Sequence, residues 1–232
     1  MPKKKKKDNE QQSSRNISFD HSSFQNLFSP VTSPVAVKPS QGNLTGSERV
    51  TKDSAADIYN AILKWNNLNL SGAAIMSKIA NCKLQAIFEP STTVSADVSP
   101  PSTTMPLEME PLCEKLLKTV EAMEKVIHKL EAMCDVYRGL FNLEEHRHQA
   151  GDVTETVPFQ SWTYKDFEVT SAKIVEAYQK EFELKQRLVE VIAHVPDRNL
   201  LMFCTAGWLH EPYVSGETQL LLEALVTETG LK

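Results

Sequence analysis

Apolar residues recur in strict alternation of three and four positions through the middle of the chain. The pattern begins at Cys113 and runs for four heptads to Phe141. Such a narrow stripe is typical of a helix that packs as a coiled coil or in a bundle, and the predicted helix spans 107–149. We expect the stripe to bind a helix of this chain, of a copy or of another protein. The seam residues are Cys113, Leu116, Val120, Met123, Ile127, Leu130, Cys134, Tyr137 and Phe141.

A second periodic segment precedes this helix. Residues 53–89 place apolar side chains at spacings of three and four, which predicts an amphipathic helix. Ser71 and Gly72 interrupt the pattern, so we expect a kink, or a break into two helices, near Gly72. Residues 90–106 are rich in Pro, Ser and Thr and are interpreted as a linker.

The part of the chain after the seam helix predicts a group of C-terminal helices. Residues 150–162 contain glycine and proline and are interpreted as a loop. Residues 163–232 then begin with Thr163 and Asp166 in a capping-box pattern. Since no segment has the pattern of a strand, we predict an all-α fold, an elongated helical bundle or coiled coil with a disordered N-terminal tail.

The stretch GWLHEPYV, residues 207–214, gathers two aromatic residues, a histidine and a glutamate near the end of the chain. His210 beside Glu211 suggests acid–base chemistry, but no phosphate loop, G-x-S-x-G or H-E-x-x-H motif accompanies the pair. We therefore expect no enzymatic activity. Trp208 and Tyr213 favour packing at a corner between helices, or an anchor for a partner.

Residues 1–52 have few large apolar side chains and many Ser, Asn, Gln and Pro residues, which predicts a disordered tail. A basic run near its start is a candidate nuclear-import signal. Three serines precede prolines and are candidate sites for a proline-directed kinase. The basic run is Lys3, Lys4, Lys5, Lys6 and Lys7, and the serines are Ser29, Ser33 and, in the linker, Ser99.

Charge and cysteine spacing narrow the function classes further. The formal net charge is −5, and because the five lysines of the tail contribute +5, the rest of the chain carries −10. Such a body is a poor direct binder of nucleic acid. The four cysteines form no C-x-x-C motif, and no apolar run approaches the roughly 20 residues of a membrane span. We expect a reduced, intracellular protein without a metal, a cofactor or a membrane anchor.

Three stretches carry a family resemblance: ADIYNAILKWNNLN with the following IANCKL, FQSWTYKDFEVTSAKIVEAYQKEFELKQ, and GWLHEPYVSGETQLLLEALVTETG. They resemble the cyclin-dependent kinase 2-interacting protein family, over residues 53–88 and 107–232. The resemblance implies a small, non-catalytic, α-helical adaptor with no catalytic, metal or cofactor residues. The N-terminal tail has no counterpart in it, so the lysine run and the Ser-Pro sites rest on their own evidence.

The resemblance also implies partners. These are cyclin-dependent kinase 2, the kinase that fires replication origins, and the ATR-interacting protein of checkpoint signalling. A further implied partner is an AAA-ATPase complex with a second small helical subunit, which acts in maturation of the large ribosomal subunit and at replication forks. We therefore expect a nuclear interaction subunit that pairs through helices. The alternative is a structural coiled-coil protein that self-associates through the seam.

Overall fold

The structure, a computed structural model, describes residues 46–88, 108–151 and 156–231. Within these ranges every regular element is a helix, which confirms the all-α prediction. The lysine run, Ser29, Ser33 and Ser99 lie outside the described residues. The helices are α2 (Ser47–Phe88), α3 (Glu110–Gln149), α4 (Tyr164–Ile192), α5 (Arg198–His210) and α6 (Gly216–Glu228).

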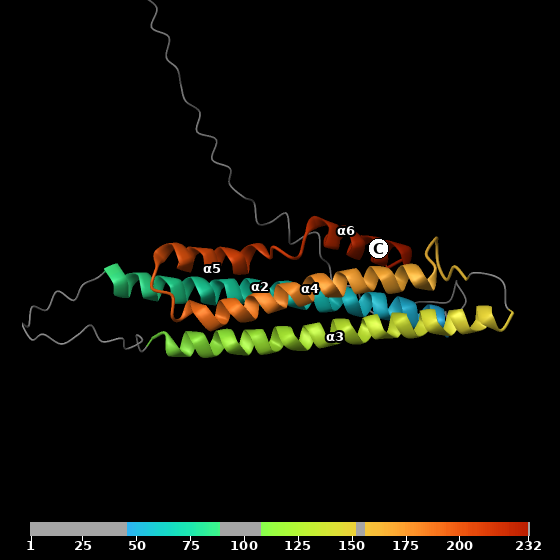
Figure 1. The fold of residues 1–232 in the computed structure, drawn as a ribbon, viewed down its shortest axis with the longest axis horizontal. Coiled ribbons are helices and arrows are strands. Elements are labelled where there is room, and N and C mark those ends of the chain that lie inside the picture. Colours follow the sequence, from blue (N-terminus) through green and yellow to red (C-terminus); the bar gives the residue numbers. More distant parts are fainter. Residues whose placement is uncertain (1–45, 89–107, 152–155, 232) are drawn as a thin grey trace, which may run out of the picture.

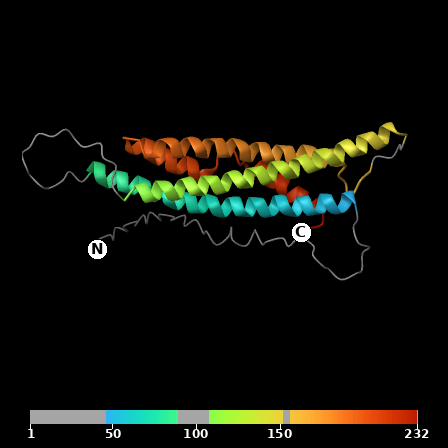
Figure 2. The same ribbon diagram turned by 90° about the horizontal axis from the view of Figure 1, so that it is seen from below.

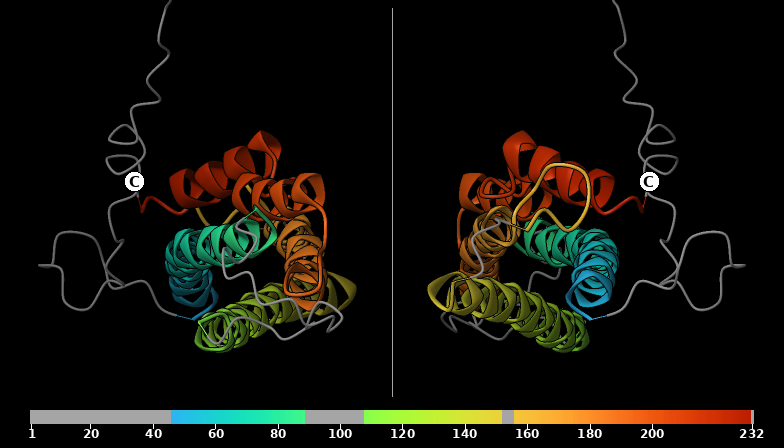
Figure 3. Two further views of the ribbon diagram at one scale, coloured as in Figure 1. Left: turned by 90° about the vertical axis from the view of Figure 1, so that its left-hand side faces the viewer. Right: turned by 90° about the vertical axis from the view of Figure 1, so that its right-hand side faces the viewer.

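Three long helices form the body of the molecule. α2, α3 and α4 run side by side along its long axis, and α5 and α6 follow one another along one side of the bundle (Figure 1, Figure 2). α3 contacts α2 and α4, whereas α5 and α6 both pack against α2 and α4 (Figure 3). At 1.5 Å per residue, the 42 residues of α2 span about 63 Å. The result is an elongated bundle with a core that runs along its length.

Local capping sets the start of each C-terminal helix. At α4 the Thr163 hydroxyl accepts the Asp166 N–H, and the Asp166 carboxylate accepts the Thr163 N–H at 2.9 Å, which completes the expected capping box. Asp197 caps α5 through the Leu200 N–H, and Ser215 caps α6 in the same way. These contacts involve residues three positions apart, which is why the sequence pattern finds them.

α2 differs from the expectation for 53–89 in two ways. It begins at Ser47, because Tyr137 of α3 donates a hydrogen bond to the Thr51 carbonyl (3.0 Å) and so holds the polar first turns against the bundle. The helix also continues unbroken through Gly72. A Cβ built on Gly72 would lie 2.2 Å from Cζ2 of Trp208. The glycine therefore makes room for an indole ring, and it marks no break in the helix.

The loop before α4 is anchored to α6 by one carboxylate. Glu228 accepts hydrogen bonds from the main-chain N–H groups of Gln160 (2.8 Å), Ser161 and Trp162 (2.9 Å), and from the Ser161 hydroxyl. Burial alone raises the pKa of Glu228, but these hydrogen bonds outweigh burial and hold the pKa below its ordinary value of 4.5. α6 and the start of α4 are thereby fixed to each other.

Candidate functional site

The seam of α3 lies inside the chain's own bundle. Six of its nine residues are at most 5% exposed, and Cys113, Val120 and Phe141 are half-buried. The Tyr137 ring stacks on Phe167 of α4 with centroids 5.7 Å apart, while its hydroxyl reaches α2. α2 and α4 thus cover the buried positions of the seam. The buried seam residues are Leu116, Met123, Ile127, Leu130, Cys134 and Tyr137.

The GWLHEPYV stretch forms the corner that ends α5. Glu211 adopts a left-handed conformation (φ 46°), and it is the one residue other than glycine with a positive φ in the described ranges. Left-handed backbone is costly for a residue with a side chain, so other contacts must hold it. One such contact is a hydrogen bond from the Trp65 indole N–H to the Glu211 carboxylate, at 2.7 Å. The strained turn directs the carboxylate toward α2.

The two aromatic residues of the corner have different surroundings. Trp208 is fully buried, donates its indole N–H to the Asn69 carbonyl at 3.0 Å, and lies over Gly72. Tyr213 is 50% exposed. Trp208 therefore fastens α5 onto α2, and of the two candidate anchors only Tyr213 stays accessible.

A fully buried lysine joins the corner to the bundle. Lys185 of α4 donates hydrogen bonds to the Asn69 side-chain carbonyl (2.7 Å) and to the main-chain carbonyl of Trp208 (2.9 Å). Its ammonium lies 3.2 Å from Glu181 and 3.6 Å from Glu211, and 4.7 Å from the centre of the Trp208 ring. One cation thus contacts α2, α4 and the end of α5. We call Asn69, Glu181, Lys185 and Glu211 the corner cluster.

Electrostatics in the corner cluster are set by burial. Burial lowers the pKa of Lys185 below its ordinary 10.5, and the carboxylates of Glu211 and Glu181 oppose that shift. Burial raises the pKa of Glu211, and Lys185 and the Trp65 N–H oppose it. The other carboxylate, Glu181, accepts the Tyr213 main-chain N–H at 3.1 Å. Each charged group is therefore held by specific contacts, and the side chains of Glu181 and Lys185 have no exposed surface for a substrate.

His210 and Glu211 do not form a catalytic pair in this geometry. His210 is exposed, whereas the Glu211 carboxylate is engaged with Trp65 and Lys185. A general base must lie within hydrogen-bond reach of a group that it can deprotonate, and adjacency in the sequence does not provide this. Sequence analysis missed Lys185 and Glu181. The available signal was an i, i+4 ion pair on the apolar face of a helix, where charges are rare unless paired.

Comparison with known proteins identifies the family. No protein-family model matches the chain. It is 36% identical over 202 residues to the cyclin-dependent kinase 2-interacting protein of Xenopus laevis, which covers 85% of this chain and 96% of that protein. The bovine and human proteins of the same name are 34% and 33% identical over 204 residues, 84% of this chain and 94% of each. The chain belongs to the cyclin-dependent kinase 2-interacting protein family.

The stretches by which the sequence resembles this family meet at the corner cluster. ADIYNAILKWNNLN supplies Trp65 and Asn69, the long second stretch supplies Lys185, and GWLHEPYV supplies Trp208 and Glu211. Residues that are far apart in the sequence thus build one structural joint.

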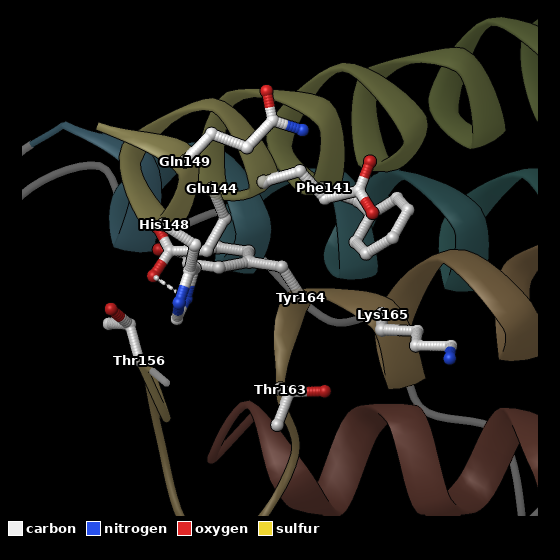
Figure 4. Close-up of a pocket in the computed structure, with 9 residues that line it drawn as sticks. Phe141, Glu144, His148, Gln149, Thr156, Thr163, Tyr164 and Lys165 are labelled. Atoms are coloured by element: carbon white, nitrogen blue, oxygen red, sulfur yellow. Dashed lines mark ion pairs between the residues drawn. The ribbon is translucent and has the colours of Figure 1, made fainter. Parts of the chain in front are cut away.

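A shallow cleft opens at the far end of the bundle, where α3 ends and α4 begins. It encloses about 490 Å³, and Figure 4 shows Glu144, His148 and Tyr164 along its wall. Glu144 forms ion pairs with Arg147 (3.4 Å) and His148 (3.6 Å). The described part of the chain contains no group of three or more His, Cys, Asp or Glu residues that could hold a metal ion. Nor does any described helix have the length and apolarity to cross a membrane.

Apolar side chains are exposed along the outer side of α5. Met202 is 56% exposed, Phe203 63% and Leu209 48%, and Tyr213 follows at the corner. Leu201, Cys204 and Trp208 occupy the opposite side of the helix and are buried. α5 thus carries apolar side chains on both its buried and its exposed sides. We call Met202, Phe203, Leu209 and Tyr213 the α5 face.

Proposed function

We propose that this protein is a non-catalytic adaptor that holds partner proteins on its helical surface. The observation that carries the proposal is its family membership: relatives named for interaction with cyclin-dependent kinase 2 match 83–85% of the chain and are 32–36% identical to it. A relationship over that length makes a shared mode of action the simplest expectation. By this proposal the protein binds a cyclin-dependent kinase 2.

The geometry supports an adaptor better than an enzyme. Two buried charged groups with shifted pKa values, Lys185 and Glu211, contact one another and their neighbouring helices in a closed joint. Perturbed groups at an active site normally face a cavity. The long helices instead present a stiff surface of about 60 Å along which separate partners can bind.

The proposal extends to the wider roles that the family resemblance implies. The protein then works in the nucleus, in DNA replication and in ATR checkpoint signalling, with the origin-firing kinase and the ATR-interacting protein as partners. It also joins an AAA-ATPase complex, with a second small helical subunit, in maturation of the large ribosomal subunit. The lysine run at 3–7 supports nuclear import, and Ser29, Ser33 and Ser99 supply candidate phosphorylation sites.

Direct binding of purified components tests the central claim. The full chain is immobilised, and cyclin-dependent kinase 2, alone and with its cyclin, is passed over it in a biolayer interferometry experiment. Saturable binding at micromolar concentration or below is the expected result. The absence of binding by both forms at 50-fold higher concentration would contradict direct interaction with this kinase. A kinase of an unrelated family serves as the specificity control.

A further inference from the structure

The corner cluster holds more negative than positive charge inside the fold. The side chains of Glu181 and Lys185 are fully buried, and that of Glu211 is 18% exposed. Two carboxylates therefore face one ammonium group, which gives a net charge of −1 when all three groups are ionised. Because uncompensated charge is costly away from water, one bound proton would stabilise the cluster.

The hydrogen bonds of Lys185 add to this imbalance. An ammonium group has three N–H donors, and Lys185 donates two of them to uncharged carbonyls, that of the Asn69 side chain (2.7 Å) and that of the Trp208 main chain (2.9 Å). One donor remains for two carboxylates. In agreement with this, the buried Oε1 of Glu181 lies 3.2 Å from the ammonium but accepts no hydrogen bond from the described residues.

Of the two carboxylates, Glu211 is better placed to take the proton. Glu181 lies nearer to the ammonium, at 3.2 Å against 3.6 Å, and its other oxygen accepts the Tyr213 main-chain N–H. In Glu211 the same oxygen, Oε1, accepts the Trp65 N–H and faces Lys185. A proton on Oε2 of Glu211 leaves both contacts in place, and the partial exposure of this side chain gives the proton a path to water.

The other groups around Glu211 do not supply the missing positive charge. Trp65 of α2 donates a hydrogen bond but carries no charge. Burial raises the pKa of the Tyr178 hydroxyl of α4, and the carboxylates of Glu211 and Glu181 raise it further, so this hydroxyl stays neutral. His210 of α5 precedes Glu211 in the chain, but its side chain is exposed to water. His210 is therefore the second titrating group that an experiment must separate from Glu211.

We propose that the corner cluster is a pH-sensitive switch that holds α5 closed while one proton is bound to Glu211. With the proton bound, the cluster is neutral and its contacts with α2 and α4 hold the end of α5. When the proton leaves, the excess negative charge favours an open state in which Glu211 turns into water. Opening also relieves the left-handed backbone at Glu211 (φ 46°), which is strained in the closed state.

The direction of the pH dependence follows from linkage between proton binding and opening. Burial raises the pKa of Glu211 above its ordinary 4.5 in the closed state, and opening returns the carboxyl to water. The stabilisation by the proton is therefore complete below pH 4.5 and is lost as the pH rises through the raised pKa. Lys185 acts in the opposite sense at alkaline pH, because burial lowers its pKa below 10.5 and favours its neutral form.

Carboxyl titration by NMR detects the proton directly. The full chain is labelled with ¹³C at the glutamate side-chain carboxyl, and the Glu211 signal is assigned by through-bond correlation to its backbone. We expect a midpoint above 4.5 for Glu211, and the Trp65 indole N–H signal should shift with the same midpoint. Glu228, whose hydrogen bonds hold its pKa below 4.5, is the internal control. A midpoint at or below 4.5 for Glu211 overturns the proposal.

Hydrogen exchange then tests whether the proton closes α5. The opening constant of the α5 amides, corrected for the intrinsic pH dependence of exchange, is compared at about pH 5.5 and pH 8. It should rise about threefold or more with pH in the unaltered chain, but stay constant in Glu211→Gln, which keeps an acceptor for Trp65 and carries no charge. His210→Asn should retain the rise. The α6 amides should show none, because the anchor of α6, Glu228, is ionised at both pH values.

Other results contradict the switch. If Glu211→Gln keeps the rise, another group controls α5, and if His210→Asn removes it, that group is His210. A rise that Glu181→Gln removes and Glu211→Gln keeps would place the proton on Glu181. Equal changes in α5 and α6 would show unfolding of the whole bundle, and no release of a single helix. None of these measurements involves a partner, so they decide the switch separately from the adaptor function.

Discussion

Gly72 and Trp208 form the closest contact between α2 and α5. The indole ring lies where a Cβ of residue 72 would be, and its N–H bonds the Asn69 carbonyl one turn earlier. An unfavourable residue for a helix interior is accepted here because a large apolar ring is buried in return. At the residue scale, therefore, Trp208 can pack against α2 because Gly72 has no side chain.

Gly72→Ala should destabilise the protein although alanine is the better helix former. A Cβ within 2.2 Å of Trp208 forces the ring or the helix to move, which typically costs about 1–3 kcal/mol. Gly139→Ala is the control, because a Cβ on this glycine of α3 meets nothing within 4 Å, and it should stabilise by about 0.5–1 kcal/mol. Urea unfolding followed at 222 nm measures both. Equal, stabilising effects would show that Trp208 does not pack on Gly72.

Lys185→Ala should be among the most damaging substitutions of a charged residue. It leaves the carboxylates of Glu181 and Glu211 buried without their cation, a loss that costs about 3–5 kcal/mol. Lys180→Ala, which removes the exposed ion pair with Glu176 one turn earlier on α4, should cost less than about 1 kcal/mol. The same unfolding assay compares them. Similar effects of the two substitutions would argue against the buried cluster.

At the scale of the element, α3 is the helix that carries the seam. Its heptad pattern is indistinguishable from that of an intermolecular coiled coil, since a bundle of antiparallel helices uses the same knobs-into-holes packing. What distinguishes the two is the position of α2 and α4, which cover the seam from both sides. α3 is therefore a core element of this chain.

Two leucines of α3 test this assignment. Leu130→Ala empties a fully buried seam position and should destabilise by about 2–5 kcal/mol in the isolated chain. Leu117→Ala, at a position 52% exposed on the same helix, should change stability by less than about 0.5 kcal/mol. The thermal midpoint of unfolding reports the difference. A soluble, fully stable Leu130→Ala variant that loses a partner would instead assign the seam to an interface.

The molecule as a whole is an elongated bundle (Figure 1). Side chains of all five helices meet in its core. For a structural protein to self-associate through the seam, the six buried seam residues would have to leave their contacts with α2 and α4. The apolar surface that remains exposed on α5 is short, since it comprises side chains of one 13-residue helix and the turn after it.

Sedimentation should accordingly find the purified chain as a monomer. We expect a mass of 26.0 kDa, with a frictional ratio above that of a sphere because the helices are long. Analytical ultracentrifugation at 5 to 50 µM measures both quantities. A stable species of twice that mass would favour the self-associating alternative, and Phe203→Asp would then show whether the α5 face mediates it.

The sequence by itself determined the features that depend on neighbours within a few residues. Helical periodicity marked α3 and the interior of α2 and α4, and the Thr163–Asp166 capping box placed the start of α4, because three- and four-residue spacings directly reflect the geometry of one helix. The family resemblance, too, was visible in contiguous stretches. The true start of α2 was not, because a distant residue, Tyr137, stabilises it.

Only the tertiary structure decided which surfaces are used and which remain free. The seam could have served a partner, Gly72 could have broken a helix, and Trp208 could have faced outward. Each outcome depends on contacts between residues 30 or more positions apart in the sequence. The buried Lys185 shows the physical reason most clearly. This charge on an apolar helix face is tolerated because its own helix and two other segments supply carbonyl and carboxylate oxygens around it, and no local pattern records that convergence.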